Sequence, residues 1–312
     1  MVFIHHNNPF TQGFLSGLAH ESYIGVSLFF VLSGFLITIR YDTVPLDFGR
    51  YIQNRFARVY PLWFLLTTLT FFVAGEWGWT YVANITLIKG FVDELKFTGI
   101  SQGWSLSVEE TFYLLAPLFF IAIRRTKLAL FIPLVMVLIS WNNFVLIYTF
   151  IGRSFDFFAG IMLAKLAKDQ RSGQLLTWAG VSGLLLCLCS LSLCLPATAG
   201  SGGTYGFEVP AGLFVHHALV PVFTAVLLYG LIAESTWIRR LLSTKPMQLA
   251  GKASYAFYLV HLGVIAAWIS ERISSNILVL FILLNGVAIA LYYTVERPLR
   301  RYFLPENEKN LR

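Results

Sequence analysis

The sequence predicts an all-α protein, a polytopic bundle of membrane-spanning helices, and three observations support this prediction. Of the 312 residues, 57% are hydrophobic and only 12% are charged, whereas an average soluble domain is about 25% charged. The 28 Phe, 14 Tyr and 8 Trp suit lipid-facing and interfacial positions. Several apolar runs have about the 17–25 residues that cross a bilayer. They are 59–75, 128–147, 175–195, 213–233 and 277–295.

Read along the chain, these runs and weaker ones predict nine spans within one transmembrane domain of residues 1–312. The predicted spans are 23–39, 59–75, 104–123, 128–148, 154–167, 174–195, 211–233, 253–269 and 276–296. The apolar stub Met1–Ile4 resembles the last turn of an earlier helix, so we expect a truncated first helix and ten spans in the full pattern. The short run Tyr81–Val92 is predicted to be an interfacial or re-entrant piece.

The distribution of basic residues predicts the orientation. Of the 23 lysines and arginines, 19 lie in alternate connections on one side of the predicted bundle, which includes the C-terminus. The positive-inside rule makes this side cytoplasmic. The net charge of +7 does not indicate nucleic-acid binding, because the basic residues lie between spans and form no stripe with exposed aromatics. The three cysteines match no metal-binding spacing, and no metal is expected.

Two polar groups suggest acid–base chemistry. His5 and His6 lie at the outer end of the stub, where a histidine can act as a general base; the alternative is an interfacial pair without chemistry. Glu109 and Glu110 enter a predicted span, and Glu109 shares a helix face with Tyr113 at i, i+4. Their alternative is a cluster of acids that caps the first helical turn.

Two further groups suggest binding. Arg55 and Arg58 are spaced i, i+3 on the cytoplasmic side, so both can contact one phosphate group; the alternative is plain anchoring at the membrane surface. Tyr258 and His261 lie in the middle of a predicted span, and their alternative is a packed, hydrogen-bonded core. We interpret the remaining histidines, His20 and the pair 216–217, as structural.

Six segments in order resemble the integral membrane acyltransferase 3 family. Residues 25–38 read G-V-S-L-F-F-V-L-S-G-F-L-I-T, with Ser27 where the family usually has Asp. Residues 55–61 read R-F-A-R-V-Y-P, residues 104–113 W-S-L-S-V-E-E-T-F-Y and residues 152–160 G-R-S-F-D-F-F-A-G. Residues 254–261 read S-Y-A-F-Y-L-V-H, without the family's following proline, and residues 296–301 read E-R-P-L-R-R. The family's initial basic G-L-R element is missing.

The resemblance implies a multi-pass O-acetyltransferase of the bacterial inner membrane. It would move an acyl group, commonly acetyl, from cytoplasmic acyl-CoA to a hydroxyl of a cell-surface or lipid-linked carbohydrate. The implied catalytic residues are His5, then His6, with Glu109 and Glu110, and Arg55 and Arg58 would bind acyl-CoA. Substrate-pocket candidates are Trp104, Tyr113, Arg153, Asp156, Tyr258 and His261. The alternatives are a transporter or flippase of a lipid-linked saccharide, which would use the same buried polar residues as a pathway, and an inactive truncated paralogue.

Overall fold

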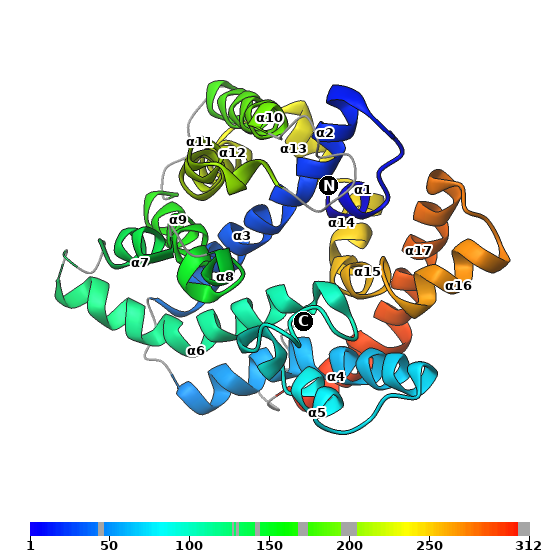
Figure 1. The fold of residues 1–312 in the computed structure, drawn as a ribbon. Helices are drawn as coiled ribbons and strands as arrows, with labels where there is room; N and C mark the ends of the chain where they lie inside the picture. The colour runs from blue at the N-terminus through cyan, green and yellow to red at the C-terminus, as the bar shows by residue number, and fades with distance from the viewer. Residues whose placement is uncertain are drawn as a thin grey trace. The chain divides into compact units, whose positions relative to one another are not determined.

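The computed structural model describes residues 1–42, 47–126, 128, 131–140, 144–167, 174–194 and 205–304. Every regular element in these ranges is a helix, which confirms the predicted class (Figure 1). The chain forms two compact units. The first unit comprises Met1–Val44 and Leu115–Leu241, and the second comprises Pro45–Leu114 and Leu242–Arg312.

Six helical stretches in the described ranges are long and apolar enough to cross a membrane. They are Gly13–Tyr41, Phe48–Ala74, Ser101–Arg125, Leu175–Cys194, Pro210–Ala233 and Ile277–Phe303. Each contains most of one predicted span, and several begin earlier than the apolar run because polar residues continue the same helix. The protein is therefore a helical protein with several candidate spans, but the predicted total of nine is not confirmed.

The other three predicted spans, 128–148, 154–167 and 253–269, do not correspond to any of these six long helical stretches. Span 154–167 corresponds to α9 (Phe150–Leu166), which has 17 residues. Span 128–148 lies partly outside the described residues, which form α7 (Ile132–Ser140) and α8 (Phe144–Ile147). Span 253–269 is wrong as one helix, because α15 (Ser254–Val260) and α16 (Val264–Arg272) are separate. Gly263 lies between them at φ +85°, a conformation that glycine adopts readily and that ends a helix.

The core of the first unit is a close packing of α3 (Gly25–Tyr41) against α9. A Cβ atom on Gly34 would lie 2.1 Å from the Phe157 carbonyl oxygen, and one on Gly160 would lie 2.0 Å from that of Val31. The two backbones are therefore in contact, as small residues permit in membrane helices. Helices α10 (Leu175–Cys194) and α12 (Val220–Ala233) also pack side by side (Figure 1).

Several short elements of the first unit precede or interrupt its long helices. Helices α1 (Val2–His6) and α2 (Gly13–Glu21) and the 3-10 turn η1 (Ser22–Ile24) precede α3. The turn η5 (Gly206–Glu208) precedes α11 (Pro210–Phe214). A π-helical turn, η6 (Val215–Leu219), follows and leads into α12. Such a turn shifts the side-chain register of a helix and is frequent at functional sites. The unit ends at α13 (Trp237–Leu242).

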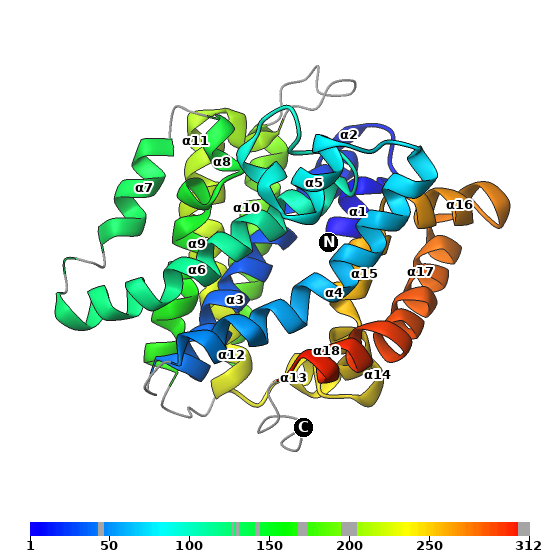
Figure 2. The same ribbon diagram turned by 90° about the horizontal axis from the view of Figure 1, so that it is seen from below.

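The second unit is built around α4 (Phe48–Ala74). The Asp47 carboxylate caps its first turn at the Arg50 amide, and Gly75 ends it in the left-handed conformation. The first part of α6 (Trp104–Arg125) belongs to this unit, as do α14 (Lys245–Lys252), α15 and α16. Figure 2 shows α17 (Ile277–Leu291), the π-helical turn η7 (Tyr292–Glu296) and α18 (Arg297–Phe303) as one continuous rod.

The connection between α4 and α6 has a polar core of its own. It contains α5 (Trp79–Ile85) and two 3-10 turns, η2 (Ile88–Phe91) and η3 (Ser101–Gly103). The fully buried Lys89 donates from Nζ to the carbonyl oxygens of Thr98, at 2.5 Å, and Ile100, at 2.9 Å. The Trp63 indole of α4 donates to the Asn84 carbonyl at 3.0 Å. This connection is compact and includes the segment predicted to be interfacial or re-entrant.

Candidate functional site

A group of imidazole, phenol, guanidinium and carboxylate side chains lies in the first unit, and we call it the histidine cluster. Helices α1, α2 and α9 and the turns η1 and η6 contribute to it, together with the residue before η5. Its members are His5, His20, Glu21, Tyr23, Arg153, Asp156, Tyr205 and His216.

His5 is held in one defined tautomer. Its Nδ1 lies 2.5 Å from the backbone carbonyl oxygen of His20. A carbonyl oxygen only accepts hydrogen bonds, so Nδ1 carries the proton and Nε2 carries the lone pair. His5 is half-buried, whereas His6 is exposed with its ring centroid 4.5 Å from that of His5. Of the two predicted histidines, His5 has the geometry of a positioned base.

Arg153 forms the buried part of the cluster. Its side chain has no solvent exposure, and its Nη2 donates to the Tyr23 hydroxyl at 2.8 Å. Its Nη1 lies 3.2 Å from His216 Nδ1 and 3.8 Å from the Asp156 carboxylate. The Tyr23 ring lies 5.6 Å from the His5 ring. The structure therefore brings together His5, Arg153 and Asp156, which were predicted as separate candidates.

The contacts of Ser27 explain how the cluster accommodates a serine at the position where the family usually has Asp. Ser27 is fully buried, its Oγ accepts from Arg153 Nη1 at 3.3 Å, and it hydrogen-bonds to Asp156. The carboxylate that pairs with Arg153 comes from α9 itself, one turn further along the helix. A buried guanidinium needs such a partner, and Asp156 supplies it while the Ser27 hydroxyl accepts from Nη1.

Of the three histidines interpreted as structural, His20 and His216 lie in this cluster and His217 lies beside it. His20 Nδ1 lies 3.1 Å from the Glu21 carboxylate and its ring centroid lies 5.3 Å from that of His5. His216 is bonded to Arg153, and the buried His217 contacts the Gly152 carbonyl through Nδ1 at 3.0 Å. The available signal was an acid, Glu21, directly after His20 in the chain.

A second group lies in the second unit, and we call it the carboxylate–arginine cluster: Arg55, Arg58, Glu109, Glu110, Tyr113 and Glu296. The Tyr113 hydroxyl donates to the Glu109 carboxylate, which confirms the predicted i, i+4 pairing. The Arg55 guanidinium lies 5.3 Å from the centre of the Tyr113 ring. Arg55 also interacts electrostatically with Glu110, and Arg58 with Glu296. All six lie on α4, α6 or η7.

The alternative of helix capping for the two glutamates is wrong. Helix α6 begins at Trp104 and its first turn holds no acidic residue. Glu109 is only 3% exposed and lies one turn further in, where a main-chain amide is already hydrogen-bonded within the helix. Its partner is therefore a side chain, Tyr113. The Tyr51 hydroxyl, which donates to the Tyr113 carbonyl at 2.8 Å, ties this part of α6 to α4.

The segments 104–113 and 254–261 meet in the second unit. The Ser105 and Tyr258 hydroxyls lie 2.7 Å apart. Gln102, which the sequence did not single out, donates to the carbonyl oxygens of Tyr258 and Leu259 at 3.0 and 3.1 Å. His261 contacts the Tyr258 carbonyl through Nδ1 at 2.7 Å. The candidates Tyr258 and His261 are thus parts of one hydrogen-bonded junction, and the buried Trp104 lies next to Ser105 in the chain.

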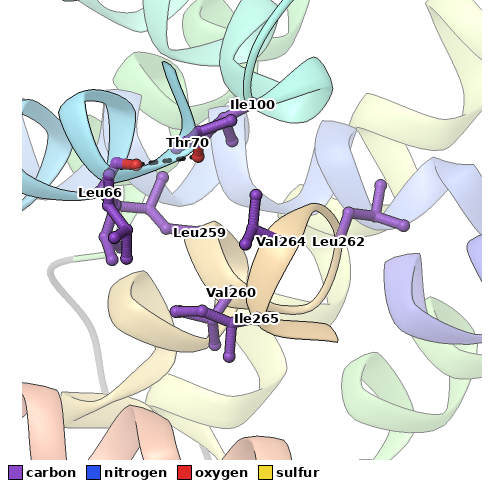
Figure 3. Close-up of a pocket in the computed structure, with 9 residues that line it drawn as sticks. Leu66, Thr70, Ile100, Leu259, Val260, Leu262, Val264 and Ile265 are labelled. Atoms are coloured by element: carbon purple, nitrogen blue, oxygen red, sulfur yellow. Dashed lines mark hydrogen bonds between the residues drawn. The ribbon is translucent and has the colours of Figure 1, made fainter. Parts of the chain in front are cut away.

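An apolar pocket also lies in the second unit but contains none of the predicted site residues. Figure 3 shows its lining, which comes from α4, α15, α16 and the segments beside them. It consists of Leu66, Leu69, Thr70, Ile100, Leu259, Val260, Leu262, Val264 and Ile265. The Thr70 hydroxyl is satisfied by the Leu66 carbonyl at 2.9 Å. Its lining offers no acidic or basic side chain.

Comparison with known proteins supports the resemblance. A family model described as an acyltransferase domain matches residues 1–303, which include both clusters. The chain belongs to the acyltransferase 3 family. No solved structure matches the chain significantly.

Three bacterial relatives are similar over most of this chain. YrhL of Bacillus subtilis, provisionally named a peptidoglycan O-acetyltransferase, is 25% identical over 90% of this chain and 51% of its own length. The peptidoglycan O-acetyltransferase OatA of Listeria monocytogenes is 24% identical over 79% of this chain and 45% of its own. The O-acetyltransferase OatA of Staphylococcus aureus is 25% identical over 96% and 55%. The chain therefore spans about half the length of these relatives.

Proposed function

We propose that this protein is a membrane O-acetyltransferase. It moves an acetyl group from acetyl-CoA on the cytoplasmic side of the bacterial inner membrane to a hydroxyl of a carbohydrate at the outer face. Membership in the acyltransferase family and the names of the relatives support the reaction class. Because two of these names refer to peptidoglycan, a cell-wall glycan is the acceptor we propose.

The observation that carries the proposal is the fixed tautomer of His5. A sugar hydroxyl is a weak nucleophile until its proton is removed. His5 Nε2 takes this proton while Nδ1–H remains bonded to the His20 carbonyl. The hydroxyl oxygen then forms a bond to the thioester carbonyl carbon, the carbon–sulfur bond breaks, and the thiolate of CoA takes the proton back from His5. The step balances with no further reactant.

The carboxylate–arginine cluster is our candidate for the donor site. The phosphates of CoA cannot enter hydrocarbon, and the charge distribution places Arg55 and Arg58 at the cytoplasmic end of α4. A guanidinium binds phosphate through two parallel hydrogen bonds. Arg55 is only 6% exposed and Arg58 is half-buried. Arg55 therefore contributes mainly to holding Tyr113 and Glu110, whereas Arg58 is more accessible to a ligand.

The test uses the purified protein in nanodiscs with radiolabelled acetyl-CoA and an N-acetylglucosamine oligosaccharide. We expect acetyl transfer by the wild type, a loss of at least about 100-fold in kcat for His5→Ala, and acetyl-CoA binding that is retained. Arg58→Ala should weaken acetyl-CoA binding, whereas Arg50→Ala, an exposed arginine on the same helix that contacts Asp47, should not.

Each part of the proposal can fail separately. Absence of transfer by the wild type to any carbohydrate would overturn the assigned function. Full activity of His5→Ala would exclude it as the base, and a loss confined to His6→Ala would move that role to His6. Unchanged acetyl-CoA binding by both Arg55→Ala and Arg58→Ala would remove the donor site from this cluster.

A further inference from the structure

Next to His5 lies a second imidazole whose orientation is also fixed. His20 Nδ1 lies 3.1 Å from Glu21 Oε1. A carboxylate accepts hydrogen bonds, so Nδ1 of His20 carries a proton and donates it. The Nε2 atom of His20 therefore carries the lone pair, as it does in His5. The cluster thus presents two hydrogen-bond acceptors on neighbouring rings, with centroids 5.3 Å apart.

Glu21 is a carboxylate at a position where its burial lowers the stability of the protein. Its side chain has no solvent exposure, and it lies within a helical stretch apolar enough to cross a membrane. Oε1 accepts from His20 and from the Gly206 amide, the latter at 2.9 Å. Oε2 has no hydrogen-bond partner among the residues that the structure describes. A buried carboxylate with so little compensation is unfavourable for stability, which indicates that it serves the site.

The Gly206 contact gives Glu21 a second effect. Gly206 follows Tyr205, and the Tyr205 amide donates to the Glu208 side chain at 3.1 Å. The Tyr205 ring lies 4.8 Å from the His20 ring and 5.8 Å from the His5 ring, by centroids. One carboxylate therefore fixes both an imidazole and an aromatic ring beside the base. His5, His20 and Tyr205 are half-buried, so each keeps an accessible edge.

We propose that His20 and Tyr205 form the acceptor subsite and that Glu21 positions both. This inference rests on the proposed function. The ligand is a sugar ring with two neighbouring hydrogen-bond donors. One is the hydroxyl that reacts at His5, and the other donates to His20 Nε2. The Tyr205 ring contacts the apolar C–H face of the sugar. His20 keeps its own proton throughout, and only His5 exchanges one with the substrate.

The test compares acceptors as well as variants. The substrates are methyl N-acetylglucosaminide and its analogues that lack one hydroxyl at a time. For the wild type, we expect one deoxy sugar to be inert, because it lacks the reacting hydroxyl. A second should have a KM raised by about 3–10-fold, the equivalent of one neutral hydrogen bond. In His20→Ala that second sugar and the parent sugar should have equal KM values, both raised, with kcat changed by less than about threefold.

Conservative variants separate positioning from a merely structural role. His20→Gln retains an acceptor oxygen and should recover part of the difference in KM between the parent sugar and the second deoxy sugar. Glu21→Gln should raise the acceptor KM with little change in acetyl-CoA binding, and Glu21→Asp should recover part of that loss. Gln12→Ala, at the exposed other end of α2, is the matched control and should behave like the wild type.

Two results would overturn the assignment of the subsite. One is an active His20→Ala enzyme that keeps the full wild-type penalty for every deoxy sugar. The other is a loss of kcat in His20→Ala with an unchanged acceptor KM, which would make His20 part of the proton transfer. If the wild type acetylates no sugar at all, the proposed function itself fails, and this inference fails with it.

Discussion

The buried Lys89 allows a quantitative prediction about stability. Burial lowers its pKa from 10.5 to about 7. A neutral amine has two N–H donors, and Lys89 Nζ has two carbonyl acceptors, those of Thr98 and Ile100. The neutral form is therefore fully satisfied in the folded protein. We replace the residue by Met, which keeps its length and removes both the titration and the hydrogen bonds.

The sign follows from the number of bound protons. Between pH 7 and about 10.5 the unfolded chain holds a proton on Lys89 that the folded protein has lost, so the free energy of unfolding rises with pH in this window. Below pH 7 both states hold the proton, so Lys89 no longer makes the free energy of unfolding depend on pH. The lowering of the pKa from 10.5 to about 7 sets an upper limit of about 5 kcal/mol on the change in the free energy of unfolding across this window. Two pH units within the window correspond to about 3 kcal/mol, or roughly 5 °C or more in Tm.

The assay is thermal unfolding in detergent, followed by tryptophan fluorescence at pH 7.5, 8.5 and 9.5. The difference in Tm between wild type and Lys89→Met should grow steadily with pH. Lys252→Met removes an exposed lysine of α14 and controls for the loss of one positive charge. A difference in Tm that stays constant over this range would refute the reasoning, because Lys89 would then be charged in the folded protein.

Three further predictions test the packing, a helix cap and the orientation. Gly160→Ala should destabilise the protein by about 1–3 kcal/mol or more, because the new methyl group meets the Val31 carbonyl; an unchanged Tm would contradict the close contact of α3 and α9. Glu234 accepts from the amides of Leu176 and Thr177, which lowers its pKa. Glu234→Gln should therefore lower the free energy of unfolding by about 1 kcal/mol at neutral pH, and this difference should shrink as acid protonates the wild-type carboxylate. A cysteine at Ser201, which lies outside the described residues, should be labelled from the outer side, and one at Thr244 only after permeabilisation; the reverse pattern would invert the topology.

Much of the fold could be predicted from the sequence because the evidence for it is local. Apolar composition and run length indicated membrane-spanning helices, and six of the nine predicted spans correspond to long apolar helices. The break at Gly263 could not be predicted from hydropathy, because apolar residues lie on both sides of it. A glycine is compatible with a continuous helix, and only its backbone angles show that this one lies in the break and precedes the first turn of α16.

The candidate sites divide in the same way. Glu109 and Tyr113 could be paired from their spacing, because helix geometry alone places residues i and i+4 on one face. The cap alternative failed because α6 begins at Trp104, so Glu109 and Glu110 lie beyond its first turn. Tyr258 and His261 are also close in the chain, but the link of Tyr258 to Gln102 spans more than 150 residues and has no sequence signal.

The sequence by itself determined the class, the family and most residues that could carry chemistry, because these depend on composition, helical periodicity and short motifs. Only the tertiary structure decided that His5 contacts the His20 carbonyl and that Arg153 joins Tyr23 and His216. These contacts join different helices and depend on how closely their backbones pack and on where a π-helical turn shifts the register. The sequence alone does not specify those distances, so the histidine cluster can be identified only in the folded structure.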